Sequence, residues 1–372
     1  KREQFIIMRQ LQKKLKNEAG RERMQIENKI IDNNNHFVIA EIGHNHGGDI
    51  TTCKKMFKIA KECGADAVKL QKRDNKTLYT KAYYNKPYDN ENSFGKTYGE
   101  HRDALEFGFT EYRELQDYAK ELDIVFFATA FDIPSALFLK AFDMPAYKIA
   151  SADLTNIPLI KFIAKINKPM IISTGGAAIE DIDRVYKMFK DSICGTPPFA
   201  FLHCVATYPN HTKDLNLSFI KTLKEKYPDI IIGYSNHHPA VFTNYIAYAM
   251  GARIFEVHFT LSRASKGTDH SYSLEPRALE TLCEDLKRIQ QSIGSGEKIV
   301  LKEETAAIQK MGKSIWPIKP IKQGEKLSIN DNIALKTPAS DGLKPYELSN
   351  INNKIAIHDL STANSLREGD CG

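Results

Sequence analysis

From residue 36 onward, short apolar runs alternate with longer stretches that carry apolar residues at helical spacing. The stretches at 51–64, 110–122 and 180–191 are clear examples of that spacing. Because strands covered on both faces read as continuous apolar runs, the pattern predicts a parallel sheet flanked by helices. The runs expected to form strands are 37–43, 67–71, 125–131, 146–151, 169–175, 199–205, 230–235 and 253–260.

Eight such strand–helix units favour the α/β class, and within it a (β/α)8 TIM barrel over an open, doubly wound sheet. A dinucleotide-binding sheet would also carry a GxGxxG turn after its first strand, and none follows 37–43. We therefore expect residues 36–293 to form the barrel. The long polar and aromatic connection at 72–109 leaves the carboxyl end of the second strand, where a substrate lid or a subunit contact is expected.

The segments outside the barrel follow other patterns. Residues 1–35 are basic and place Ile7, Met8, Leu11 and Leu15 at weak helical spacing, so we expect a helical extension or linker. Residues 294–312 begin in a Gly/Ser break and are expected to be a linker. In residues 313–372, short apolar runs between Gly and Pro turns predict a small β-rich module.

Composition excludes several classes of protein. The chain is 42% hydrophobic and 26% charged, which is typical of a globular protein. Its net charge of +6 lies almost wholly in residues 1–30, which hold nine Lys/Arg and four Glu, so no basic face for nucleic acid is expected. No apolar run approaches the roughly 18 residues of a membrane span. The six cysteines are scattered without a CxxC pair, which fits a reducing, cytoplasmic compartment.

Polar residues gather where the predicted strands end, which is the active-site face of a barrel. A single buried lysine can serve a structural ion pair, but Lys69 and Lys148 both lie inside apolar strands, where an unpaired charge is costly. Lysines beside hydroxyl groups indicate a site for phosphate and carboxylate groups. The other polar candidates at these ends are Glu41, Gln71, Thr129, Ser151, Ser173, Thr174, Ser235 and Asn236.

His237 and His258 are the candidate metal ligands. His237 follows the seventh predicted strand, His258 lies in the eighth, and Glu256 lies two residues before His258. A histidine at a strand end can also be a hydrogen-bonded structural residue. As ligands, the pair with oxygen donors and water would suit Mn²⁺ or Mg²⁺ better than a tetrahedral structural zinc.

Several motifs resemble the sialic acid synthase family. They are IAEIGHNHGGD (39–49), GADAVKLQ (64–71), PAYKIAS (145–151), ISTGG (172–176), YPDIIIGYSNH (227–237), EVHFT (256–260) and KGTDHSYSLEP (266–276). The tail is similar to the C-terminal antifreeze-like domain of that family. The likeness runs from about residue 36 to the end, and GKTYGEHRDALEF (95–107) favours the animal-type branch.

The resemblance implies a metal-dependent condensation of phosphoenolpyruvate with the open-chain aldehyde of an N-acylated hexosamine, such as N-acetylmannosamine or its 6-phosphate. It implies a divalent metal held by His237 and His258, and Glu256 as a proton acceptor. Glu41 and Asp269 would bind sugar hydroxyls, and Tyr208 would line the sugar pocket. It also implies a domain-swapped homodimer, in which the antifreeze-like domain covers the partner's barrel. The residues that would bind phosphoenolpyruvate are Lys69, Lys148, Thr129, Ser151, Ser173 and Ser235.

Two departures from the bacterial branch leave the identity of the acceptor sugar undetermined. Ala206 stands where that branch has Asn, and Thr337 stands where it has an Arg that reaches the acceptor. A synthase of another deoxy-sugar acid, such as a legionaminic or pseudaminic type, therefore remains an alternative. A non-catalytic carbohydrate- or ice-binding protein is a third interpretation, although Glu41, Lys69 and Lys148 would have no use in a catalytically dead barrel.

Overall fold

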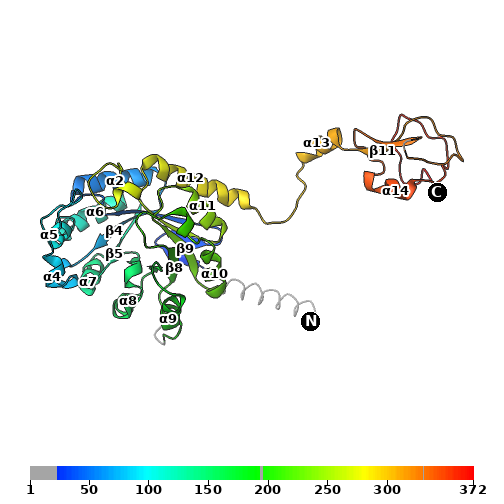
Figure 1. Cartoon of the computed structure of the whole chain (residues 1–372). Helices are drawn as coiled ribbons and strands as arrows, with labels where there is room; N and C mark the ends of the chain where they lie inside the picture. The colour runs from blue at the N-terminus through cyan, green and yellow to red at the C-terminus, as the bar shows by residue number, and fades with distance from the viewer. Residues whose placement is uncertain (1–22, 193–195, 330) are drawn as a thin grey trace. The chain divides into compact units, whose positions relative to one another are not determined.

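The computed structural model describes residues 23–192, 196–329 and 331–372. Among these residues, eight parallel strands close into a barrel in which each strand pairs with its neighbours in sequence, and the last pairs with the first (Figure 1). The predicted (β/α)8 TIM barrel is therefore confirmed. Its strands are β3 (Phe37–Gly43), β4 (Ala67–Lys72), β5 (Val125–Ala130), β6 (Tyr147–Ile149), β7 (Met170–Ser173), β8 (Phe199–Cys204), β9 (Ile231–Asn236) and β10 (Ile254–His258).

The helices between the strands form because their apolar residues recur on one face. In α9, for example, Ile182, Val185 and Phe189 are buried on one face, and charged residues such as Arg184 and Lys187 lie between them in the sequence. The Asp49 side chain starts α2 by accepting hydrogen bonds from the backbone N–H groups of Thr51 and Thr52. These outer helices are α2 (Ile50–Glu62), α6 (Phe109–Glu121), α7 (Ile133–Ala141), α8 (Ile157–Ala164), α9 (Ile179–Lys190), α10 (Phe219–Lys226), α11 (Phe242–Ala249) and α12 (Pro276–Ile293).

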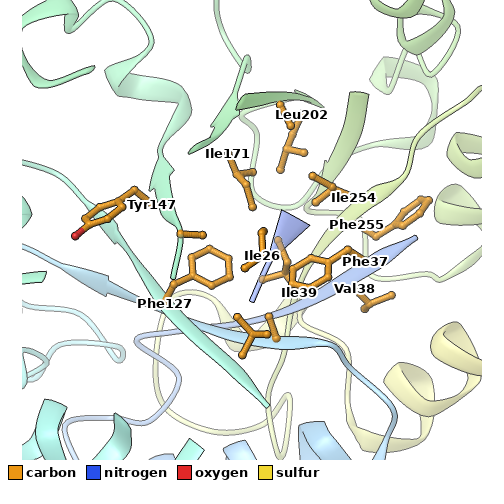
Figure 2. Close-up of a cluster of buried hydrophobic side chains, with 14 of the residues drawn as sticks. Ile26, Phe37, Val38, Ile39, Phe127, Tyr147, Ile171, Leu202, Ile254 and Phe255 are labelled. Carbon is orange, nitrogen blue, oxygen red and sulfur yellow. The ribbon is translucent and has the colours of Figure 1, made fainter. Parts of the chain in front are cut away.

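Apolar side chains from the strands fill the interior of the barrel. Figure 2 shows Ile39, Phe127, Ile171 and Leu202 converging from four strands, with Ile26 among them. All five side chains are fully buried. The centre of the barrel is thus a packed core, and this rigid core fixes where the polar residues at the strand ends lie.

Residues 23–32 correct the expectation of a helical extension or linker over 1–35. They form a hairpin of β1 (Arg23–Ile26) and β2 (Lys29–Asp32), which buries Met24, Ile26 and Ile31 in the barrel core. Lys29 also pairs with Asp66, just before β4, at 3.0 Å. The hairpin therefore closes the amino-terminal end of the barrel. The predicted helix in residues 1–22 lies outside the described residues.

The connection at 72–109 contains three short helices, α3 (Asn75–Leu78), α4 (Lys81–Tyr84) and α5 (Tyr98–Asp103). A capping box starts α5: the Thr97 hydroxyl accepts from the backbone N–H of Glu100, and the Glu100 carboxylate accepts from the backbone N–H of Thr97. The segment is consequently ordered and holds its side chains in defined positions. Elsewhere there are short 3₁₀ helices, η1 (Ser151–Asp153), η2 (Thr212–Asp214), η3 (His270–Tyr272) and η4 (Pro345–Glu347).

The chain divides into two compact units between Ile293 and Gly294. The second has its own apolar core, which includes Ile315, Leu327 and Ile333. It contains the antiparallel pair β11 (Ser314–Pro317) and β12 (Ile333–Lys336) and the helix α14 (Leu348–Ile351). That this unit is an antifreeze-like domain stays a prediction.

The structure differs in one respect from the linker predicted at 294–312. Helix α13 (Glu304–Met311) occupies its second half, and the Gln309 carbonyl accepts a hydrogen bond from the Ala339 backbone N–H at 2.9 Å. Residues 304–312 therefore belong to the second unit. Across the described part of the chain, no helix combines the length and apolar character needed to span a membrane.

Candidate active site

The carboxyl ends of the barrel strands surround a cavity of about 810 Å³. A cavity of this size lies within the usual range for small-molecule sites, roughly 300–1,000 Å³. Most of the residues predicted from the sequence line it, namely Glu41, Lys69, Gln71, Thr129, Lys148, Ser151, Ser173, Tyr208, Ser235, His237, Glu256, His258 and Asp269.

Thr174 and Asn236 are exceptions, because neither lines the cavity. The Thr174 hydroxyl donates to the Leu202 carbonyl at 3.0 Å, and the Asn236 amide donates to the Thr243 hydroxyl at 3.1 Å. Each directly follows a serine that does line it, Ser173 or Ser235. Successive strand residues point to opposite faces, so both members of such a pair cannot face the same site. Thr174 and Asn236 therefore point away from the cavity and make hydrogen bonds within the fold.

Lys69, Lys148, Glu41 and Glu256 form what we call the lysine cluster. Lys69 Nζ lies 2.7 Å from Glu41 Oε2 and 3.8 Å from Glu256 Oε2, and Lys148 Nζ lies 3.8 Å from Glu256 Oε1. The strand register brings them together, since Glu41 is opposite Lys69 and Thr129 is opposite Lys148. Each lysine is thus paired with a carboxylate and still faces the cavity.

Hydroxyl groups complete the lysine cluster. Lys69 donates to Thr129 Oγ1 and Lys148 donates to Ser173 Oγ, each at 2.7 Å. Ser235 Oγ donates to Glu256 Oε1 at 3.3 Å. Ammonium groups and hydroxyls arranged around one pocket are donors for phosphate and carboxylate oxygens. These groups lie together in the cavity as expected from the sequence, and their binding of an anion stays a prediction.

The pKa values of the two buried carboxyl groups, Glu41 and Glu256, are shifted in opposite directions. Burial raises the pKa of Glu41, and Lys69 only partly offsets this. Burial would also raise the pKa of Glu256, but the positive charges of Lys148 and Lys69 outweigh it and hold that pKa below its ordinary value. Two neighbouring carboxyl groups with separated pKa values are typical of sites that move protons.

The end of β3 allows a close approach of polar groups. The register between β3 and β4 shifts between Glu41 and Gly43, and Gly43 has a φ of +53°. A Cβ at this position would lie 3.1 Å from Glu41 Oε1 and 3.2 Å from Gln71 Nε2. Glycine therefore permits the hydrogen bond in which Gln71 Nε2 donates to Glu41 Oε1 at 2.7 Å.

His237 and His258 lie together at the cavity wall, with ring centroids 5.2 Å apart. His237 Nδ1 lies 3.1 Å from the Val205 carbonyl, to which it donates, and this leaves Nε2 free as a ligand. His258 Nδ1 is buried without a hydrogen-bond partner and lies 3.8 Å from Asp269 Oδ2. Within the described ranges, no three His, Cys, Asp or Glu side chains form a ready-made metal cluster. A cation held by this pair would need its other ligands from water and substrate, and such a metal site stays a prediction.

The sequence analysis missed two arginines that line the same cavity, Arg73 and Arg102. Arg73 follows β4, two residues after Gln71, so strand alternation could have pointed to it. Arg102 lies in α5, inside the connection that was interpreted only as a lid or subunit contact. We call these two residues the arginine pair.

The fold and the site together define a TIM-barrel enzyme whose cavity holds a cluster of buried lysine and glutamate side chains. The model of the NeuB family matches residues 56–298, and the chain belongs to this family, that of the sialic acid synthases. It is a sugar-acid synthase of the sialic acid synthase type.

Known relatives support the assignment over most of the chain. The N-acetylneuraminate-9-phosphate synthase of Homo sapiens is 37% identical over 89% of this chain and 91% of its own. The N,N'-diacetyllegionaminic acid synthase of Campylobacter jejuni is 33% identical over 89% of this chain and 98% of its own. The solved N-acetylneuraminic acid synthetase of Leptospira borgpetersenii is 34% identical, with a TM-score of 0.67 over 77% of this chain and 95% of that one.

Proposed function

We propose that this enzyme condenses phosphoenolpyruvate with the open-chain aldehyde of an N-acylated hexosamine of the N-acetylmannosamine type. The products are a nonulosonic acid and inorganic phosphate. The observation that carries the proposal is the lysine cluster with its hydroxyls, next to two histidines at the mouth of the same barrel. Phosphoenolpyruvate brings a phosphate and a carboxylate, which match two ammonium groups ringed by hydroxyl donors.

The reaction forms one carbon–carbon bond. The C2–C3 electron pair of phosphoenolpyruvate attacks the aldehyde carbon, and water adds to C2. The resulting intermediate loses phosphate by cleavage of its C–O bond, which leaves a 2-keto acid. Lys69 and Lys148 stabilise the charge on the phosphate and carboxylate, and Glu256, ionised between them, accepts a proton of the water.

Asp269 and Glu41 bind hydroxyls of the acceptor and hold its aldehyde near the histidines. Both carboxyl groups line the cavity, and Asp269 lies beside His258. A divalent cation, Mn²⁺ or Mg²⁺, held by His237 and His258 would polarise the aldehyde oxygen as a Lewis acid. Tyr208, whose ring centroid lies 4.2 Å from that of His237, forms a wall of the acceptor pocket.

The test is phosphate release from phosphoenolpyruvate with a panel of aldoses, with added Mn²⁺ and after chelation. We expect release to require an N-acylated hexosamine and to vanish with the chelator. The variant His258→Ala should lose metal-dependent turnover and keep the thermal unfolding midpoint within a few degrees, since about 1 kcal/mol shifts the midpoint by roughly 2–4 °C in domains of about 150–250 residues. Aldose-independent release, or full activity of the variant with an unchanged metal requirement, would contradict the proposal.

We also propose a cytoplasmic, domain-swapped homodimer in which the second unit covers the partner's barrel. Support comes from exposed apolar residues at the start of the second unit, including Val300, Ile308 and Met311 at 71%, 62% and 66% exposure. The buried cysteines Cys53, Cys63, Cys204 and Cys283 are all free, which suits a reducing compartment. Deleting residues 313–372 should leave a folded barrel with severely reduced activity. A fully active truncated monomer would contradict the assembly.

A further inference from the structure

Asn210 closes the turn that follows β8. Its side chain is only 4% exposed, and Nδ2 donates to the Val205 and Thr207 carbonyls and to Thr207 Oγ1, each at 2.9 Å. An amide NH₂ group has two hydrogens, so one of them is shared between two of these acceptors. The asparagine thereby holds together the whole turn from Val205 to Asn210, which includes Tyr208.

The same asparagine is joined to the main chain of His237, the residue that follows β9. Asn210 Oδ1 accepts from the His237 backbone N–H at 3.2 Å, and the Asn210 backbone N–H donates to the His237 carbonyl at 3.1 Å. These two hydrogen bonds lie on either side of the His237 Cα. One residue therefore ties the turn after β8 to the end of β9.

The Val205 carbonyl connects Asn210 to the imidazole of His237. It accepts from Asn210 Nδ2 at 2.9 Å and lies 3.1 Å from His237 Nδ1. Because a carbonyl can only accept, this contact requires that Nδ1 carries the proton of the neutral ring. The hydrogen bond at one ring nitrogen sets which nitrogen faces a cation or a substrate. A carbonyl held by Asn210 thus fixes the tautomer and the orientation of His237.

Tyr208 takes its position from the same turn. Its side chain is 57% exposed, so little packing against the barrel core restrains it. Its ring centroid nevertheless lies 4.2 Å from that of His237. Asn210 itself does not line the cavity, whereas His237 and Tyr208 both do. Supporting hydrogen bonds of this kind hold the groups of a site in their working geometry.

We propose that Asn210 is a positioning residue, which fixes the tautomer of His237 and the place of Tyr208 against it. For its effect on turnover the inference rests on the proposed function, whereas its effect on the imidazole concerns the protein alone. Without the amide, the Val205 carbonyl can turn away from the ring, and His237 then exchanges between its two neutral tautomers.

The experiment uses Asn210→Leu, which removes the amide but keeps most of the side-chain volume, together with Asn210→Ala. Asn244→Leu is the matched control. Asn244 is fully buried in α11, its Nδ2 donates to the Val241 carbonyl at 3.2 Å, and it does not line the cavity. The control therefore also loses a buried asparagine hydrogen bond, and its unfolding midpoint should fall as well.

The first readout is the tautomer of His237 in the metal-free protein. Long-range ¹H–¹⁵N spectra distinguish the two neutral tautomers, and the variant His237→Gln identifies the signal. Wild type and Asn244→Leu should show the Nδ1–H tautomer alone, because the Val205 carbonyl accepts that proton. Both Asn210 variants should show a mixture of tautomers.

The second readout is Mn²⁺ affinity by calorimetry, together with steady-state kinetics. Mn²⁺ affinity and kcat should each fall by roughly 10- to 100-fold in the Asn210 variants, as is typical when a partner of a ligating histidine is removed. Asn244→Leu should leave both unchanged. The KM of phosphoenolpyruvate should change much less than kcat, since Lys69 and Lys148 are untouched.

A wild-type spectrum with His237 in the Nε2–H form would overturn the inference without any variant. So would a single, unchanged tautomer in both Asn210 variants, or an equal loss of Mn²⁺ affinity in Asn244→Leu. If the wild-type protein neither binds Mn²⁺ nor releases phosphate from phosphoenolpyruvate, the proposed function fails. The tautomer spectra then still decide whether Asn210 positions His237.

Discussion

The lysine cluster and the arginine pair each place two cationic side chains in one cavity, but among the described residues only the lysines have carboxylate partners. Lys69 and Lys148 project from barrel strands and lie within 4 Å of a carboxylate. Arg73 and Arg102 lie beyond a strand end and in a loop helix, and they contact His44, Gln71 and Tyr98 instead. Lysines that are paired with carboxylates in the fold are held in position for a reaction. Arginines without a carboxylate partner in the protein can take a negatively charged partner from a ligand.

The largest difference should appear in stability when Lys69 is changed to Met. The variant leaves Glu41 buried without its counterion, which should lower the free energy of unfolding by about 3–5 kcal/mol at pH 7. Circular dichroism should follow the unfolding, because the single tryptophan, Trp316, lies in the second unit. Lys69→Met combined with Glu41→Gln should recover much of the loss.

The same variant should show a defined pH dependence. Burial raises the pKa of Glu41 in the fold above its ordinary value of 4.5. A raised carboxyl pKa means that the folded state binds more protons than the unfolded state, so its stability falls as pH rises above 4.5. The loss in free energy of unfolding caused by Lys69→Met should therefore become smaller as the pH is lowered toward 4.5. A deficit that is independent of pH would exclude the unpaired carboxylate as its cause.

Lys148→Ala should have the next largest effect, on catalysis. Lys148 donates to Ser173 and faces the cavity, where it would contact phosphoenolpyruvate. We expect kcat/KM for phosphoenolpyruvate to fall by about 10²–10³-fold, with a much smaller change in the KM of the acceptor. The exposed Lys161→Ala on α8 is the control. Lost stability with an unchanged KM in the folded fraction would instead make Lys148 a structural lysine.

How far the sequence predicts the site depends on which element carries each residue. Lys69 and Lys148 could be found because a charge inside an apolar strand is conspicuous and the barrel fixes where strand ends meet. Ser173 was distinguished from Thr174 only by the structure, since the phase of a strand's alternation depends on its register. Arg102 could not be placed, because its position depends on how α5 packs beside Tyr98 and His44.

The N-terminal hairpin shows a different kind of miss. Met24, Ile26 and Ile31 are apolar positions in a charged segment, and the weak helical spacing of residues 7–15 was extended over them. Their burial depends on contact with the open end of a barrel formed by residues far along the chain. Such long-range packing is not encoded in the local pattern.

The smallest effect should come from Arg102→Met, in sharp contrast to Lys69→Met. No ion pair is broken, and repulsion with Arg73 is relieved, while the stacking on Tyr98 at 5.1 Å and the hydrogen bonds to its hydroxyl are lost. A cation–π contact contributes about 0.5–1 kcal/mol and a hydrogen bond about 1 kcal/mol, so with the relief of repulsion the free energy of unfolding should fall by no more than about 2 kcal/mol. A loss as large as that of Lys69→Met would show that the arginine pair serves the fold rather than a ligand.

The most direct test of the central claim follows the bridging oxygen of phosphoenolpyruvate labelled with ¹⁸O between C2 and phosphorus. The lysine cluster is proposed to hold the phosphate while the C–O bond breaks. The account predicts that the label appears in inorganic phosphate, and that its release requires the hexosamine acceptor and is strongly reduced in Lys148→Ala. Label retained in the organic product, or phosphate released equally without acceptor, would contradict it.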